Sequence, residues 1–357
     1  MQKLKVMVVG CGNMGTSHAK AFHSIEGCQI CAIVDKFRQS REKLNNLLGG
    51  GYPLFEDVDE ALKAAKPDVV AICTYPETHE PLAIKAMEAG CHVFVEKPLA
   101  TSVEAAERVA ETAKRLNRKV VVGYILHYHP SWKKFVELSK TLGKPLVMRM
   151  NLNQQSHGFM WNVHKNLMKS SAPIVDCGVH YVDIMCQMTG AKPVSVSAIG
   201  ARLSGQIDER QFNYGQLQVR FDDGSVGWYE AGWGPMASTN AFFVKDVWGP
   251  NGCVSIEPKP EHKEGKSDNV DSHTKTDLLK VHYAQQDENN EFVKKDEFIN
   301  TEDEPTHDEL CRREQEFLLD AIRNDVDLTD HLNSAIESLR IVLAADESAH
   351  TGKTVEF

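Results

Sequence analysis

Three side chains capable of acid–base chemistry lie at helical spacing in the apolar stretch SAPIVDCGVHYVDIMCQMTG, residues 171–190. Asp176, His180 and Asp183 are four and three residues apart, so one continuous helix would place all three on the same face. An imidazole held by a carboxylate can take a proton from a substrate hydroxyl. The alternative is a hydrogen-bonded polar cluster at the edge of a core, and the rest of the chain has to decide between the two.

Lys97 is a second candidate for chemistry, because it directly follows an apolar segment in HVFVEKP. A rigid strand end could hold its ammonium group against an oxygen that becomes negative during a reaction. Lysine also changes its pKa readily when it is desolvated. The alternative is a surface lysine fixed by Glu96, and from these residues alone both interpretations stay open.

A glycine-rich loop near the N-terminus predicts the cofactor on which such groups would act. The apolar strand KLKVMVV runs into Gly10, Gly12 and Gly15, and a helical pattern follows. Gly10 permits a tight turn, Gly12 lets the backbone approach a pyrophosphate, and Gly15 lets helix and strand pack closely. Asp35 ends the next strand, 20 residues beyond Gly15, where a carboxylate can bind the adenosine ribose. The pattern therefore predicts a dinucleotide site.

The acid at position 35 favours NAD over NADP, because a carboxylate repels the 2′-phosphate of NADP. Lys36, Arg38 and Arg41 follow closely and weaken this preference without reversing it.

The first 124 residues alternate between apolar strands and helical patterns. The helical patterns cover residues 37–48, 56–65, 78–89 and 102–116, and the strands between them include DVVAICT, HVFVEKP and KVVVGY. This alternation predicts a doubly wound parallel sheet, which binds ligands at the carboxyl ends of its strands. The residues directly after the strands are therefore candidates for binding: Thr74, Tyr75, Pro76, Glu96, Lys97, Pro98, Gly123 and Tyr124.

The pattern changes after about residue 125, where hairpins replace the alternation. QLQVRF alternates strictly between apolar and polar residues, and a DDGS turn joins it to VGWYEAG. A second hairpin is predicted in AFFVKDVWGPNGCVSIE, and clustered hairpins indicate an antiparallel sheet. Residues 257–306 are predicted to be solvated loops and short edge strands. Thr306 and Glu309 form a predicted capping box before the final helices.

The composition excludes several classes of partner. A formal charge of −10 over 357 residues, with both signs mixed, argues against nucleic acid and anionic membranes. No apolar run approaches the roughly 20 residues of a membrane span. The nine scattered cysteines, among them the Cys28–Cys31 pair, predict reduced thiols and a cytoplasmic location. No set of Cys, His and Asp has the spacing of a zinc site, so no metal is expected.

Three motifs together resemble the glucose–fructose oxidoreductase / inositol dehydrogenase / MocA (Gfo/Idh/MocA) family. They are GCGNMG, the long segment TYPETHEPLAIKAMEAGCHVFVEKPLA (residues 74–100), and DCGVHYVD (residues 176–183). The C-terminal SAIESLRIVLAADESAHTGKTVEF is similar as well. The resemblance is close over residues 1–130 and 174–190, and looser over residues 191–305.

The resemblance implies an α/β protein of two domains. Residues 1–124 would form an NAD(P)-binding Rossmann domain. Residues 125–357 would form a substrate-binding and oligomerisation domain with a large, mostly antiparallel open sheet, and the C-terminal helices could pack back towards the first domain. In this family the sheet often forms the interface of a homodimer or homotetramer. The implied activity is NAD(P)-dependent oxidation or reduction of a secondary alcohol in a sugar, cyclitol or related polyol.

The resemblance also assigns roles to residues. The family's catalytic lysine falls on Lys97, its acid/base histidine on His180, and the associated aspartate on Asp176. The cofactor-binding residues expected from the motifs are Gly10, Gly12, Asn13, Met14, Gly15, Asp35, Lys36, Thr74, Tyr75, His79, Glu96 and Lys97. The candidate substrate contacts are Tyr124, Trp161, His164, Asp183 and Trp233. For Trp161, His164 and Trp233 the alternative is packing under the sheet, and for Asp183 it is a structural role at the helix edge.

Two departures from the family pattern prevent any transfer of substrate identity. Many members have an arginine pair where this chain has Leu126 and His127, and a glycine cluster where it has SSAP. Two other functions also stay open. One is a redox-assisted sugar lyase or glycosidase that recycles a tightly bound NAD, and the other is a non-enzymatic dinucleotide sensor. The sensor would have no use for Lys97, Asp176 and His180 together.

Overall fold

The computed structural model describes residues 3–238, 243–257, 274–301 and 304–357, and the chain divides into two compact units. The first unit contains Met1–Ile125 and Pro305–Ile336, and the second contains Leu126–Glu304 and Glu337–Phe357. The first break lies one residue beyond the boundary expected from the sequence. Residues 305–336 belong to the first unit again, so one boundary in the sequence does not separate the two units.

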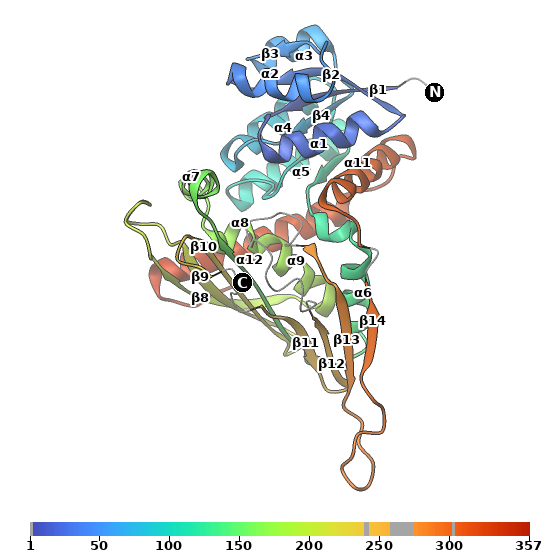
Figure 1. The fold of residues 1–357 in the computed structure, drawn as a ribbon, viewed down its shortest axis with the longest axis vertical. Coiled ribbons are helices and arrows are strands. Elements are labelled where there is room, and N and C mark those ends of the chain that lie inside the picture. The colour runs from blue at the N-terminus through green and yellow to red at the C-terminus, as the bar shows by residue number, and fades with distance from the viewer. Residues whose placement is uncertain (1–2, 239–242, 258–273, 302–303) are drawn as a thin grey trace. The chain divides into compact units, whose positions relative to one another are not determined.

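The first unit is built on a parallel sheet of six strands in the order β3-β2-β1-β4-β5-β6, which confirms the predicted doubly wound fold. Its strands are β1 (Leu4–Val9), β2 (Cys28–Val34), β3 (Leu54–Phe55), β4 (Val69–Ile72), β5 (His92–Val95) and β6 (Val120–Val122). Its helices are α1 (Asn13–Ser24), α2 (Arg38–Leu47), α3 (Val58–Ala65), α4 (His79–Glu88), α5 (Val103–Leu116) and α11 (His307–Arg323). Helix α11 packs against α1, beside the sheet (Figure 1).

Short polar side chains set the beginnings of several of these helices. Asp57 accepts a hydrogen bond from the backbone N–H of Glu60 at the start of α3, and Ser102 accepts one from Ala105 at the start of α5. Thr306 accepts one from Glu309 at the start of α11, which is one half of the predicted capping box. The carboxylate of Glu309 pairs with Arg312 and Arg313. The helices then bury their apolar faces against strands that are mostly apolar, which is typical of a parallel sheet.

The second unit is built on a sheet of nine strands in the order β14-β13-β12-β11-β7-β10-β9-β8-β15. Its pairs are antiparallel except for β7 and β10, so the predicted mostly antiparallel sheet is confirmed. The strands are β7 (Val147–Gln155), β8 (Pro193–Ala201), β9 (Tyr214–Phe221), β10 (Val226–Gly234), β11 (Lys245–Gly249), β12 (Gly252–Ile256), β13 (Leu278–Tyr283), β14 (Glu297–Asn300) and β15 (Val355–Glu356). Both predicted hairpins are present, as β9–β10 and β11–β12.

Among the residues that the structure describes, helices cover one face of this sheet, and we call the other its open face. They are α6 (Pro130–Ser139), α7 (Gly158–Leu167), α8 (Pro173–Asp176), α9 (Gly178–Thr189) and the C-terminal part of α12 (Thr329–Thr351). Short 3-10 turns lie at Pro76–Thr78 and Ile125–Tyr128. On the open face, Trp248 of β11, Val147 of β7 and Val226 of β10 lie side by side in the strand register. Their exposed fractions are 48%, 38% and 38%, which makes them a contiguous apolar row.

The prediction of one continuous helix over Asp176, His180 and Asp183 is wrong in one detail. Asp176 ends the short helix α8, and α9 begins after Cys177. Pro173 starts α8, and Cys177 keeps right-handed helical backbone angles, so the chain nearly continues its turn. The backbone N–H of His180 bonds to the carbonyl of Cys177 three residues back, which is the tighter 3-10 pattern.

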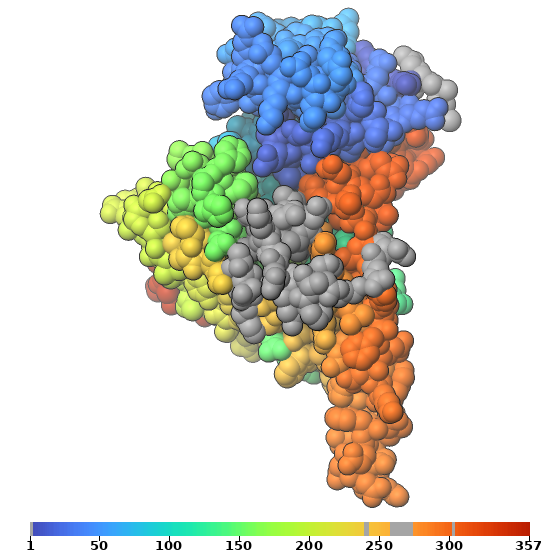
Figure 2. All heavy atoms as spheres, in the orientation of Figure 1, coloured from blue at the N-terminus to red at the C-terminus, as the bar shows by residue number. Residues whose placement is uncertain are grey.

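Residues 257–306 supply the edge of the sheet, as expected, in the residues that the structure describes. Strands β13 and β14 pair there, and the segment between them, drawn in orange, projects from the surface (Figure 2). Phe292 and Val293 in this projection are more than half exposed. Among the described helices, none has a stretch long and apolar enough to cross a membrane.

Candidate active site

The glycine loop joins β1 to α1 with the geometry that a dinucleotide needs. Gly10 has a φ of +92°, and a Cβ there would lie 2.4 Å from the carbonyl oxygen of Cys73. A Cβ on Gly15 would lie 1.8 Å from the carbonyl oxygen of Gly10, so helix and loop touch at this point. A Cβ on Gly12 would meet nothing within 4 Å. The backbone at Gly12 therefore faces open space at the N-terminus of α1, which is where a pyrophosphate would bind.

Asp35 follows β2 and lies against the same loop. Its Oδ2 accepts a hydrogen bond from the N–H of Cys11 at 2.8 Å, and its Oδ1 accepts one from the N–H of Phe37. The guanidinium of Arg41 donates to the carbonyl of Asp35 and lies 3.9 Å from Glu56, while Arg38 pairs with Glu42. Arg38 and Arg41 thus already have partners within the protein, so they are less available to bind the 2′-phosphate of NADP. This arrangement favours NAD.

The remaining predicted cofactor residues lie along the same edge of the parallel sheet. Asn13 and Met14 open α1, and the ammonium of Lys36 lies over the ring of Phe37. The hydroxyls of Thr74 and Thr78 are 2.6 Å apart after β4, and Tyr75 is 40% exposed. These positions are consistent with binding an extended ligand across the strand ends.

Lys97 follows β5, and the acid before it is held in a buried hydrogen-bond network. Glu96 is 6% exposed, its Oε2 accepts from the backbone N–H of Lys97, and its Oε1 lies 2.6 Å from Nε2 of His18. The amide of Gln315 donates to Nδ1 of His18 at 2.9 Å, so Nε2 carries the proton and donates to Glu96. Gly123 leaves room for this carboxyl group, because a Cβ there would lie 3.4 Å from it.

The pKa of Glu96 reflects two opposing effects. Burial raises it, but the hydrogen bond from His18 and the electrostatic interactions with His18, Lys97 and His79 lower it further, to about 2. Glu96 is therefore ionised at neutral pH, and its negative charge lies next to Lys97.

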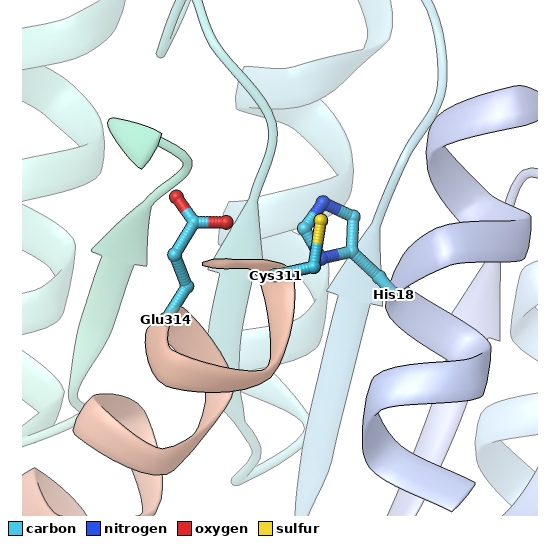
Figure 3. A group of neighbouring side chains, drawn as sticks. All are labelled: His18, Cys311 and Glu314. Carbon is cyan, nitrogen blue, oxygen red and sulfur yellow. The ribbon is translucent and has the colours of Figure 1, made fainter. Parts of the chain in front are cut away.

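Figure 3 shows a buried group beside this network, His18 of α1 with Cys311 and Glu314 of α11. The ligand atoms of the three lie within 4.8 Å of one another, which is close enough for a metal site. However, both nitrogens of His18 already have hydrogen-bond partners. Burial and the neighbouring Glu96 raise the pKa of Glu314 well above its usual value, and burial with nearby acids also raises that of Cys311. Metal ions are bound by deprotonated side chains with free lone pairs, whereas Glu314 and Cys311 are neutral and the imidazole of His18 is already hydrogen-bonded. The three residues are therefore better described as a buried polar network.

His79 supports Lys97 from the other side. It is fully buried at the start of α4, with Nδ1 2.7 Å from the carbonyl oxygen of Pro98 and Nε2 3.1 Å from that of Thr74. Burial lowers the pKa of His79, so the imidazole is neutral and donates a single N–H. The ring thus lies between the loop after β5 and the loop after β4 and contacts the backbone of both. This position gives His79 a structural role at the ends of the strands.

The second unit gathers the other predicted catalytic residues at the α8–α9 junction. Asp176 is 5% exposed, and the thiol of Cys177 lies 3.7 Å from its Oδ2 and 3.8 Å from Oε1 of Gln154. His180 is half-buried on the first turn of α9. Gln154 also accepts a 2.6 Å hydrogen bond from the indole of Trp233, which extends the polar group onto the helix-covered face of the sheet.

The aromatic candidates for substrate contact pack beside this group. His164 stacks on Trp233 with ring centroids 4.3 Å apart, and both are almost fully buried. Trp161 is 6% exposed and donates to Gln206. In the first unit, Tyr124 is 1% exposed, and its hydroxyl donates to the carbonyl of Ala335. The structure thus gives these four residues packed positions.

Asp183 is also engaged within the second unit. It is 1% exposed, and its Oδ2 lies 2.5 Å from Nε2 of His127 and 2.7 Å from the amide of Gln187. Burial lowers the pKa of His127, but the charge and hydrogen bond of Asp183 raise it more. This ion pair is a strong reason to assign Asp183 a structural role at the helix edge.

The sequence did not indicate the residues that complete the network around Lys97. His18 lies three residues after Gly15 and could have been noticed, because one helical turn places it beneath the glycine loop. Gln315 and Glu314 could not be identified, because the expectation that the C-terminal helices pack back towards the first domain does not say which residues lie against α1. Lys245, which is buried on β11, also went unremarked.

A six-stranded Rossmann sheet with this glycine loop and acid defines the class of protein, a dinucleotide-binding protein with a second, sheet-based domain. Two family models match the chain. "Oxidoreductase family, NAD-binding Rossmann fold" matches residues 4–124, and "GFO/IDH/MocA C-terminal domain" matches residues 133–244. The chain belongs to the Gfo/Idh/MocA family, and its first domain is an NAD-binding Rossmann domain.

Curated relatives are similar over part of the chain. Glucose-6-phosphate 3-dehydrogenase of Bacillus subtilis is 28% identical over 61% of this chain and 62% of its own length. The scyllo-inositol 2-dehydrogenase (NAD(+)) of the same organism is 29% identical, over 64% of this chain and 67% of its own. The matches thus span about two thirds of the length of these relatives.

Solved structures match the fold over nearly the whole chain. The scyllo-inositol dehydrogenase from Lactobacillus casei, with bound NAD(H) and scyllo-inositol, has a TM-score of 0.77 at 21% identity, with 99% of each chain covered. This likeness establishes the two-domain fold.

Proposed function

We propose that the protein is an NAD-dependent dehydrogenase that oxidises a secondary alcohol of a sugar, cyclitol or related polyol. The observation that carries this proposal is Lys97 at the carboxyl end of β5, on a buried network, in a domain whose glycine loop fits NAD. The relatives named above are a sugar-phosphate 3-dehydrogenase and an inositol 2-dehydrogenase, so both act on ring polyols.

The proposed division of labour follows from the chemistry of each side chain. NAD, when bound, accepts a hydride from the alcohol carbon. His180 removes the proton of the substrate hydroxyl, and the Lys97 ammonium donates a hydrogen bond to the oxygen as it becomes a carbonyl. Asp176, one turn before His180, stabilises the imidazolium that forms. The charge of Lys97 in turn lowers the pKa of Glu96 and so helps to keep its carboxylate ionised.

The test is a screen of NAD and NADP reduction, followed at 340 nm, against inositols, hexoses and anhydrosugars. We expect NAD to be reduced with at least one of them. His180→Ala should then lower kcat by about 100-fold or more. His23→Ala, an exposed histidine on α1, is the matched control and should leave kcat unchanged. No reduction with any polyol despite tight NAD binding would refute the dehydrogenase and favour a sensor. Substrate cleavage without net NADH would favour the lyase.

We also propose that the protein forms a homo-oligomer, a dimer or a tetramer, through the open face of the nine-stranded sheet. The apolar row of Trp248, Val147 and Val226 supports this, because rows of this kind commonly mark protein interfaces. Light scattering coupled to size-exclusion chromatography should give a multiple of 39.9 kDa, and Val147→Glu should reduce it. A monomer in the wild type would refute the proposal.

A cytoplasmic location is the remaining part of the proposal. All nine cysteines are free thiols, and six of them are buried. Such a set suits a reducing compartment. Microscopy of a fluorescent fusion would test the location, and secretion would contradict it.

A further inference from the structure

Lys245 is a buried lysine on the helix-covered face of the second unit. It starts β11, is 3% exposed and pairs with Met150 of β7. Lysine is almost never buried to this extent unless it is paired. Among the residues that the structure describes, no carboxylate lies within ion-pair distance of its ammonium group, in contrast to Lys280 on β13, which pairs with Asp296 at 3.1 Å.

Aromatic rings take the place of a carboxylate around this ammonium group. Its Nζ lies 3.8 Å from the ring centroid of Phe243 and 5.6 Å from that of Tyr181. Tyr181 stacks on Tyr229, whose buried hydroxyl has no hydrogen-bond partner in the described part of the chain. Cation–π contacts offset part of the cost of burying a charge, but they leave the N–H donors without acceptors.

The strand register relates Lys245 to residues of the candidate site on β7 and β10. Strands β11 and β7 are antiparallel, so residues before Lys245 lie beside residues after Met150. The backbone bond from Asn151 to Val244 continues this register, and it places Phe243 on the Gln154 side of Lys245. Nζ lies against the ring of Phe243, and Gln154 and Trp233 lie further along the register on that side. Gln154 is four residues from Met150 on β7, or roughly 13 Å along the strand.

Burial alone lowers the pKa of Lys245 to about 7, since no charged group contributes to the shift. Perturbed groups of this kind are concentrated at functional sites. A ligand that brought a negative charge would restore the ammonium form and fill its donors.

We propose that Lys245 and the hydroxyl of Tyr229 form a subsite for an anionic group of the substrate, a carboxylate or a phosphate carried by the sugar. This inference deepens the proposed function and rests on it. It predicts that a ring polyol with an acidic substituent binds better than the uncharged ring, with the charged end held at Lys245 and the reacting hydroxyl nearer to Asp176.

The test uses one ring with three substituents: glucose, glucuronate and glucose 6-phosphate. Their dissociation constants are measured by calorimetry on the full-length protein saturated with NADH. The wild type should bind one of the two anionic sugars roughly 10- to 100-fold more tightly than glucose, as one charge-assisted contact provides. Lys245→Met should remove this difference, and the control Lys280→Met should retain it.

Thermal unfolding shows whether Lys245→Met acts through folding. Methionine fits the space and removes an unpaired buried charge, so the variant should melt at the same temperature as the wild type or higher. Equal binding of the three sugars by the wild type would overturn the inference, as would an anion preference that survives in Lys245→Met. A lower melting temperature with weaker binding of all three sugars would also overturn it, because it would make Lys245 structural.

Oxidation of uncharged polyols by the wild type tests the proposed function separately. If these are oxidised but no anion preference is found, the dehydrogenase stands and the subsite fails. If an anion preference is found without any oxidation, the subsite stands and the dehydrogenase fails.

Discussion

Replacing His18 with alanine should strongly destabilise the first unit, because it leaves the Glu96 carboxylate buried without its hydrogen-bond donor. The pKa of Glu96, about 2 against an ordinary 4.5, measures the net stabilisation of its charged form by the network. At about 1.36 kcal/mol per pKa unit, this difference corresponds to about 3 kcal/mol at neutral pH. Both partners are almost fully buried, so little of this energy is screened by solvent.

The variant should lose more than this, because a lone buried carboxylate has to be protonated or resolvated. Leaving a buried polar group without its hydrogen-bond partner costs about 1 to 3 kcal/mol and more when the group is charged, so we expect a loss of about 3 to 5 kcal/mol. For a unit of this size, that lowers Tm by roughly 6 to 20 °C. A depressed carboxyl pKa stabilises the fold above the unfolded value of 4.5, and this stabilisation is lost as pH falls through the folded value near 2. The gap between wild type and variant should therefore shrink at acid pH.

Thermal unfolding of both proteins by circular dichroism, from pH 7 down to pH 3, is the assay. His23→Ala is the matched control, because this exposed histidine lies on the same helix and bonds only to Tyr52 among the described hydrogen bonds. His18→Gln keeps a donor and should recover part of the loss. A variant His18→Ala that melts within 2 °C of the wild type at pH 7, on the order of 1 kcal/mol or less, would refute the reasoning.

Three further substitutions test the glycine loop and the buried acid Glu314. Gly12→Ala should fold normally and weaken NADH binding about 10-fold or more in a fluorescence titration, since its methyl group meets open space where the pyrophosphate binds. Gly15→Ala should instead lower Tm, because its methyl group overlaps the backbone of Gly10. Glu314→Gln should raise Tm at pH 7 to 8 and have no effect near pH 4. The raised pKa of Glu314 makes the wild type lose stability as pH rises above 4.5, and glutamine does not titrate.

The fold of the first unit could be predicted from the sequence because every local signal agreed. Strand lengths, helix periodicity and the three glycines all indicated one doubly wound sheet, and the helices lie within two residues of the predicted ranges. The second sheet was less visible. Its hairpins β9–β10 and β11–β12 are local and were found, but the parallel pairing of β7 with β10 joins segments about 80 residues apart.

In the candidate site, too, some residues could be predicted from the sequence and others could not. Lys97 and Asp35 follow strands, so the chain order places them at a sheet edge. The partners that set their charge come from elsewhere in the sequence, as Gln315 does for His18 and His127 for Asp183. The break at Cys177 was missed because one helical residue between two short helices leaves the apolar pattern unchanged.

The return of residues 305–336 to the first unit follows from the same buried charges. Glu96 is ionised inside the unit, and its donor His18 is held in the correct tautomer by Gln315 from α11. Without α11 the imidazole would lose that hydrogen bond, and residues of the apolar core such as Phe22 and Phe94 would lose the cover of Leu318 and Leu319. The segment is therefore part of the dinucleotide-binding domain. The charge next to Lys97 depends on a helix that follows it by more than 200 residues in the chain.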